Sequence, residues 1–127
     1  MFDLSINEVR RTIICRFDEE MTVDDFAMLD EIGRTRREVA LYDCIFDLTQ
    51  VKRLDLPQGF ATERAEIPQA FRDRERVYVV TQPELRELIQ RYADGQAAKG
   101  WRAPRIVATR DEAFALLGVS SEDFRGF

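Results

Sequence analysis

Apolar and polar residues alternate at the start of the chain, in two neighbouring segments. Phe2, Leu4 and Ile6 share one face of the first segment, and the same alternation continues through residues 9–17. A period of two is typical of a β-strand, because successive side chains point to opposite faces. Only residues 7–8 separate the two segments, so they are predicted to form an antiparallel hairpin.

Four later segments carry apolar residues at the spacing of a helix with one buried face. Three of these helices are predicted to start with a threonine cap and an acidic residue three positions later, in the pairs Thr22/Asp25, Thr81/Glu84 and Thr109/Glu112. The helix before Pro68 is predicted to begin at Asp55 or Leu56, with Pro57 in its first position. The next helix should end at Gly95 or Gly100, and the last one at Gly118.

Three short apolar runs, at residues 42–46, 76–80 and 104–108, lie between the helices and are predicted to be buried strands. A loop through Val51 and Leu54 is expected after the first of them. Strands that alternate with helices require crossover connections, so the fold class is α/β. We expect a mixed, largely parallel sheet with the N-terminal antiparallel hairpin and about four helices.

Composition limits both domain number and chemistry. The chain has 127 residues, which fits one domain; we place it at residues 1–118, followed by a flexible tail at 119–127. The absence of histidine excludes Ser-His-Asp and Cys-His catalysis and His-based zinc sites. Two cysteines cannot form a four-cysteine metal site. No cofactor or metal is therefore expected. Cys15 and Cys44 fall in predicted strands, where buried thiols act as small apolar side chains.

The charge pattern bears on partners and location. The net charge is −5 and the arginines are scattered, so no nucleic acid is expected as a partner. No apolar run approaches 18 residues, which excludes membrane insertion. The first residues lack the pattern of a secretion signal, and cysteine usage is low. We therefore expect a cytoplasmic protein.

Two functional alternatives come from polar and aromatic positions. The acidic run at residues 18–20, Asp47 and Thr81 each end or follow a predicted strand, as in a degenerate phosphoacceptor receiver domain. Two features oppose the receiver interpretation. Too few residues separate the first helix from the strand that contains Asp47, and Arg110 stands where receivers have lysine. The other alternative is a carrier of a small apolar ligand, held between sheet and helices near Phe60, Tyr92 and Trp101.

A family resemblance appears in residues 46–59. The stretch resembles the signature of STAS domains, the fold of the anti-sigma-factor antagonists, which runs roughly D-L-S-x-V-x-x-I-D-S-S-G. The matching positions are Asp47, Leu48, Thr49, Val51, Leu54 and Asp55. The order of elements agrees over nearly the whole chain, and the C-terminal half is most similar to the bacterial STAS-like proteins grouped with the sporulation antagonist. The resemblance implies a regulatory domain that binds another protein.

This chain departs from the signature at the serine positions through which the family is regulated. In phosphorylated antagonists the second serine after the aspartate takes the phosphate, whereas Leu56 and Pro57 fill the two serine positions here. We therefore predict a non-catalytic protein-interaction module, not an enzyme, that acts without a phosphoserine switch or through self-association into a homo-oligomer. The expected partner-binding loop consists of Asp55, Leu56, Pro57, Gln58, Gly59 and Phe60. In the competing interpretation, Leu56 and Phe60 pack under the helix.

Overall fold

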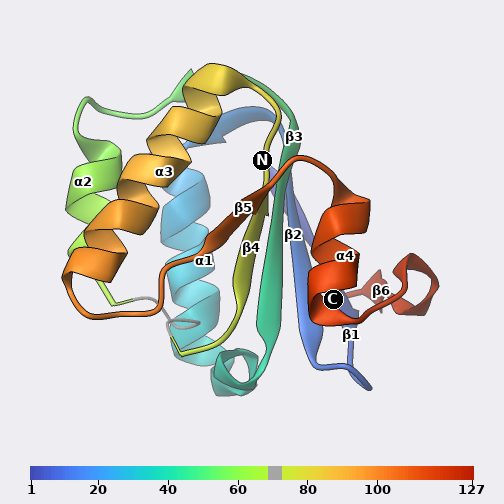
Figure 1. Cartoon of the computed structure of the whole chain (residues 1–127). Helices are drawn as coiled ribbons and strands as arrows, with labels where there is room; N and C mark the ends of the chain where they lie inside the picture. Colours follow the sequence, from blue (N-terminus) through green and yellow to red (C-terminus); the bar gives the residue numbers. More distant parts are fainter. Residues whose placement is uncertain (69–72) are drawn as a thin grey trace.

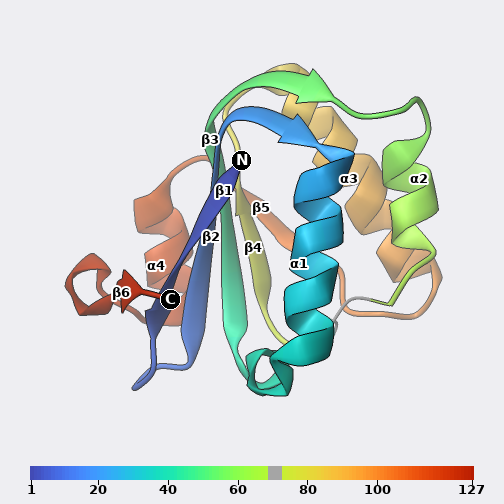
Figure 2. The same cartoon turned by 180° about the vertical axis from the view of Figure 1, so that it is seen from behind.

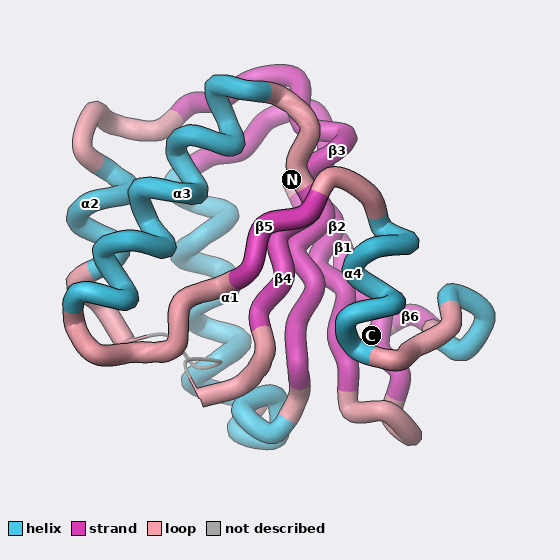
Figure 3. Tube along the Cα trace, viewed as in Figure 1, coloured by secondary structure: helices cyan, strands magenta, loops and turns pink. Residues whose placement is uncertain are grey.

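The computed structural model describes residues 1–68 and 73–127 and has a six-stranded sheet in the order β5-β4-β3-β2-β1-β6 (Figures 1 and 3). The strands are β1 (Phe2–Asn7), β2 (Thr12–Thr22), β3 (Asp43–Asp55), β4 (Arg76–Val79), β5 (Arg105–Val107) and β6 (Arg125–Gly126). The helices are α1 (Val23–Thr35), α2 (Phe60–Ala65), α3 (Pro83–Ala98) and α4 (Arg110–Leu117), with 3-10 turns η1 (Arg37–Leu41) and η2 (Ser121–Asp123). Strands β2 to β5 are parallel, and β1 is antiparallel to β2. The predicted fold class is confirmed.

The sheet separates two apolar layers. Helices α1, α2 and α3 lie on one face and α4 lies on the other, as the two opposite views show (Figures 1 and 2). The larger layer contains Phe17, Cys15 and Cys44, while Ile45 faces the smaller layer under α4. Because helices cover both faces, the middle of β3 is buried on both sides, as its continuous apolar sequence predicts.

The turn of the N-terminal hairpin is longer than predicted. Strand β2 begins at Thr12, so the alternation at Val9 and Arg11 belongs to the turn, and Val9 is 92% exposed. The side chain of Asn7 accepts a hydrogen bond from the backbone N–H of Arg10 at 3.0 Å. This local bond closes the turn, which the alternating pattern does not reveal.

The predicted loop through Val51 and Leu54 is wrong, because β3 continues to Asp55. Its pairing with β4 stops at Asp47, and beyond that point β2 and β3 continue as a two-stranded ribbon that curves over the helices (Figure 2). The register of this ribbon shifts twice, and Glu19 has a φ of 54°. The extra residues place the buried Leu48 and Val51 and the half-buried Leu54 three positions apart, so the strand shows no alternation.

Two of the three predicted threonine caps are confirmed. The backbone N–H of Asp25 donates to Thr22 Oγ1 at 3.3 Å, and the N–H of Thr22 donates to Asp25 Oδ2 at 2.9 Å. At α4 the N–H of Glu112 donates to Thr109 Oγ1 at 3.1 Å. These short-range signals are read directly from sequence, because both partners lie within one helical turn.

The other two helix starts are wrong. Helix α3 begins at Pro83 with Gln82 as its N-cap, and the Gln82 side chain donates instead to the carbonyl of Val51 at 2.6 Å. Proline at the first helical position makes Gln82 the N-cap in place of the predicted Thr81. Helix α2 begins at Phe60, so Pro57 lies before it.

Gly95 does not end α3 but lies inside it, against α2. A Cβ at Gly95 would lie 2.5 Å from the Cβ of Ala65.

We expect Gly95→Ala to lower the free energy of unfolding by about 1–2 kcal/mol, because overpacking outweighs the better helix propensity of alanine. Urea denaturation measures the change. Adding Ala65→Gly should restore most of the loss, and a single variant as stable as the wild type would contradict the close contact.

The segment after Gly118 pairs with the sheet. Residues 119–127 contain η2 and β6, and β6 is antiparallel to β1. The domain boundary at residue 118 and the flexibility of this segment stay predictions, since they concern motion and independent folding.

Candidate partner-binding site

The loop at residues 55–60, called here the 55–60 loop, connects β3 to α2. Asp55, Pro57, Gln58 and Gly59 are exposed. Gly59 has a φ of 82°, in the left-handed region that glycine adopts without strain. This conformation lets the N–H of Phe60 donate to the Pro57 carbonyl at 3.1 Å, so the middle of the loop projects away from the core.

The two apolar residues of the loop have different roles. Phe60 is half-buried and its ring lies 5.0 Å from that of Phe26, so it packs under the helix as the competing interpretation expects. Leu56 is also half-buried against the core, but it lines a surface groove as well. Leu56 is therefore the better position for testing partner contact.

The groove lies between the 55–60 loop and the start of α1. Its walls are formed by Thr22, Val23, Asp24, Asp55, Leu56 and Pro57, around a volume of about 320 Å³. The ribbon brings the two sides together, since Thr22 and Asp55 are paired across β2 and β3. Val23 is 44% exposed, which leaves an apolar side chain open to solvent. The groove thus combines apolar side chains with two carboxylates.

The carboxylates of the groove differ from their acidic neighbours. Glu19 pairs with Lys52 at 3.2 Å and Glu20 with Arg53 at 3.2 Å. In the described part of the chain, neither Asp24 nor Asp55 forms an ion pair, although both are exposed. The groove is therefore a locally uncompensated negative region.

Helix α2, which follows the loop, is fixed to its neighbours at both sides. Arg64 forms two hydrogen bonds to Asp30 of α1, at 2.8 and 3.2 Å, and its guanidinium lies 4.6 Å from the centre of the Phe26 ring. The side chain of Gln96 in α3 donates to the carbonyl of Ala65 at 2.8 Å. These contacts hold the end of the loop in place.

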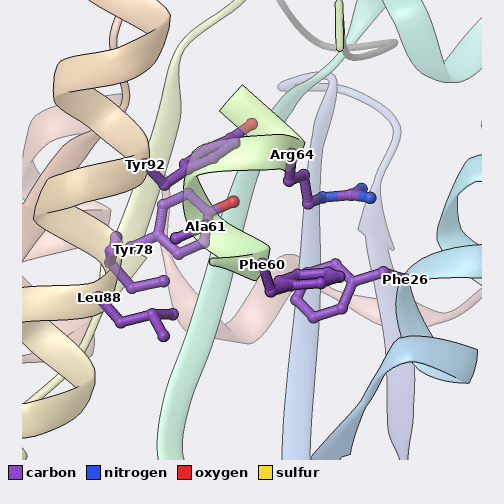
Figure 4. A pocket seen from close by; sticks show the side chains of 8 residues that line it. Phe26, Phe60, Ala61, Arg64, Tyr78, Leu88 and Tyr92 are labelled. Atoms are coloured by element: carbon purple, nitrogen blue, oxygen red, sulfur yellow. The ribbon is translucent and has the colours of Figure 1, made fainter. Parts of the chain in front are cut away.

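A small cavity lies between α2 and α3, and Figure 4 shows the side chains around it. Phe60 and Tyr92 line the cavity, as the carrier alternative expects, but Trp101 does not. Its volume of about 20 Å³ is close to that of one water molecule. Pockets for small ligands hold roughly 300–1,000 Å³, so this cavity does not accommodate an apolar ligand.

Asp47, the central residue of the receiver alternative, is buried and paired. Its Oδ1 accepts hydrogen bonds from the N–H of Thr49 at 2.9 Å and the Thr49 hydroxyl at 2.7 Å, and Arg110 Nε lies 2.6 Å from Oδ2. Burial acts to raise the pKa of Asp47, but the bonds from Thr49 and Arg110 outweigh it and hold the pKa below its ordinary value. Both oxygens are occupied.

The other acidic residues of that alternative have basic partners of their own, and Asp18 lies 3.8 Å from Arg16. Glu19 and Glu20 lie in the ribbon with their own basic partners, and Thr81 is exposed before α3. Within residues 1–68 and 73–127, no group of three acidic or cysteine side chains could hold a metal ion. The receiver geometry is therefore unsupported.

The predicted burial of both cysteines is confirmed. Cys15 and Cys44 are free thiols in the core, and burial raises the pKa of each. A protonated, inaccessible thiol is a poor nucleophile.

Sequence reasoning missed a buried polar network at the start of β4. Arg76 donates to the hydroxyl of Tyr92 at 2.9 Å, to the side-chain oxygen of Gln96 at 3.2 Å, and to the carbonyl of Arg102. Gln96 in turn holds the last turn of α2. From sequence, an arginine at the edge of an apolar run, such as Arg76, is interpreted as a solvated strand end, so no local signal reveals this network.

No protein-family model matches the sequence, and no curated protein matches it significantly. None of the helices in the described ranges is long and apolar enough to cross a membrane.

Two solved structures resemble the fold over nearly its full length. The anti-sigma factor antagonist SpoIIAA in its unphosphorylated form is 16% identical, with a TM-score of 0.61, and the match covers 93% of this chain and 98% of that one. The Bacillus cell fate determinant SpoIIAA in the phosphorylated form is 14% identical, with a TM-score of 0.53 and coverage of 92% and 99%. This likeness agrees with the signature at residues 46–59. The chain therefore has the STAS-like fold of an anti-sigma factor antagonist.

Proposed function

We propose that this protein is a non-catalytic regulatory module that binds another protein through the 55–60 loop and the adjoining groove. The groove carries the proposal, because it joins exposed apolar side chains to two unpaired carboxylates beside the loop. The fold adds support, since the solved structures that it resembles are of an anti-sigma factor antagonist.

The proposed module works without phosphorylation at the loop. Leu56 and Pro57 carry no hydroxyl group. The hydroxyl of Thr49 is engaged with Asp47 at 2.7 Å. Thr62 lies beyond the loop, within α2. Phosphorylation would therefore not change the charge of the loop, and control of binding would come from partner concentration.

The charges of the groove define the partner's chemistry. Asp24 and Asp55 would attract a segment with a lysine or arginine side chain, while Val23, Leu56 and Pro57 would contact its apolar residues. Opposite charges at a rim favour encounter and orientation, and the apolar centre provides most of the affinity.

Native mass spectrometry of gently purified protein is the first measurement. A complex with another protein supports the proposal. A reproducible bound mass of a few hundred daltons, absent after denaturation, would support the carrier alternative instead.

Once a partner is identified by mass, we expect Leu56→Asp to weaken its binding about thirtyfold, the loss typical of a central interface residue. Isothermal titration calorimetry measures the dissociation constant. Leu116→Asp is the matched control, because Leu116 is an apolar residue 44% exposed on α4, on the opposite face. Thermal unfolding by circular dichroism verifies that both variants are folded. Equal binding by the two variants would contradict the proposed surface.

A further inference from the structure

The segment at residues 119–127, called here the strap, wraps around the open edge of the sheet. Phe124 packs on the α4 face, with its ring 6.0 Å from that of Phe114. Phe127 packs on the opposite face, where the guanidinium of Arg36 lies 4.5 Å from its ring centre. Between these two anchors, β6 runs beside β1 (Figures 1 and 2).

The strap occupies hydrogen-bonding positions of β1. The N–H of Phe127 donates to the carbonyl of Leu4 at 3.1 Å, so the backbone groups of Leu4 face away from β2. Alternation along a strand gives Phe2 and Ile6 the same outward direction. The ladder pairs Gly126 with Ser5 and Arg125 with Ile6. Without the strap, β1 would present an unpaired edge, which is a template for another strand.

We propose that the β1 edge is a self-association surface for a second copy of this chain, and that the strap competes for it within the same molecule. The surface is separate from the 55–60 loop, so it goes beyond the function proposed above and can fail or hold independently of it.

The sequence of β1 fits a second copy of itself in an antiparallel pair. A two-fold axis at Leu4 places Leu4 opposite Leu4 and Phe2 opposite Ile6, so three apolar side chains continue along one face. On the other face, Asp3 lies opposite Ser5, which brings a carboxylate acceptor to a hydroxyl donor. Because Asp3 lies opposite Ser5, no like charges are directly opposed across the axis, and Arg16 at 2.8 Å offsets the charge of Asp3.

Competition by the strap would set the strength of association. Strand β6 has two residues, and Phe124 and Phe127 are both only partly buried. Such a segment opens locally at a smaller free-energy cost than global unfolding. Both copies must open before they pair, so the apparent dissociation constant of the dimer is the intrinsic one divided by the square of the open fraction, and any change that releases the strap lowers it.

A disulfide staple tests the competition directly. Ser5 and Gly126 are opposite each other at a non-hydrogen-bonded position, where the Cα atoms of an antiparallel pair approach to about 4.5 Å. A Cβ at Gly126 meets no atom within 4 Å. We expect oxidised Ser5→Cys/Gly126→Cys protein to remain monomeric in sedimentation velocity at every concentration. Reduction should restore the wild-type behaviour. Equal dimerisation of the oxidised and reduced forms would overturn the proposal.

The complementary experiment releases the strap by substitution. Phe124→Ser/Phe127→Ser should lower the apparent dissociation constant of the dimer at least about tenfold. Adding Leu4→Pro removes the outward N–H of Leu4 without touching the β1–β2 ladder, and should abolish the gain. If the released variant stays monomeric to about 1 mM while hydrogen exchange shows an open β1 edge, the proposal fails. A dimer that survives Leu4→Pro also overturns it. If the released variant does not fold, the staple alone decides.

Discussion

Arg76→Ala is expected to lower the free energy of unfolding by about 3 kcal/mol and the melting temperature by roughly 10 °C. Arg76 is 2% exposed and donates to Tyr92, Gln96 and the carbonyl of Arg102. Alanine leaves two buried acceptors and one part-buried acceptor without this donor, and it removes the volume of a long side chain. Urea denaturation followed by circular dichroism gives the free energy.

Arg76→Met separates the two contributions. Methionine keeps most of the volume and removes a buried charge that has no carboxylate partner among the described residues, so we expect less than half of the alanine loss. If the two variants are equally destabilised, packing contributes little and the expectation is contradicted. Because Gln96 also holds the carbonyl of Ala65, the amides of α2 should exchange faster in Arg76→Ala than in the wild type.

Arg110→Ala is expected to cost about 2 kcal/mol at pH 7, because it leaves the buried carboxylate of Asp47 without its cation. The loss is smaller than for a fully buried pair, since the Arg110 side chain is 42% exposed. Arg110 is the first residue of α4, where a cation opposes the helix dipole. Its place there is explained by the ion pair with Asp47.

The pH dependence follows from the depressed pKa of Asp47, which lies below 3.8 in the folded protein. A carboxyl group of this kind stabilises the fold above its unfolded pKa, and this stabilisation is lost as the pH falls through the folded pKa. Removing Arg110 raises the folded pKa, so the loss begins at a higher pH. The difference between wild type and variant should be largest near neutral pH, and should shrink as the pH falls first through the folded pKa of the variant and then through that of the wild type.

Urea denaturation across this pH range measures the difference. Asp47→Asn/Arg110→Ala is the control, because it has no titrating group at position 47. A difference between wild type and Arg110→Ala that stays constant with pH would contradict the ion pair.

The fold class was predictable because its signals are local. A helix cap such as Thr22 with Asp25 involves partners three residues apart, and the alternation at Ile13, Cys15 and Phe17 assigns these residues to one face of the sheet. Alternating strands and helices then leave few connections open. The end of β3 was not predictable, because shifts of register in the ribbon remove the alternation on which a strand is recognised.

The candidate site was likewise predictable only in part. The signature at residues 46–59 located the 55–60 loop, and the residues Leu56 and Pro57 excluded a loop phosphoserine from the sequence alone. The groove required the pairing of Thr22 with Asp55, which brings the start of α1 to a loop more than thirty residues away. The partners of Asp47 and Arg76 are likewise distant, at Arg110 and Arg102.

The sequence by itself determined the α/β fold, the position of the loop and the lack of a hydroxyl at its switch position. The tertiary structure alone decided which carboxylates are paired, how the strap covers β1, and that the cavity beside Tyr92 is too small for an apolar ligand. The physical reason is how far apart in the chain the interacting residues lie. Periodicity, caps and turns act between residues close in the chain, whereas ion pairs, close packing and strand edges depend on the register of distant segments.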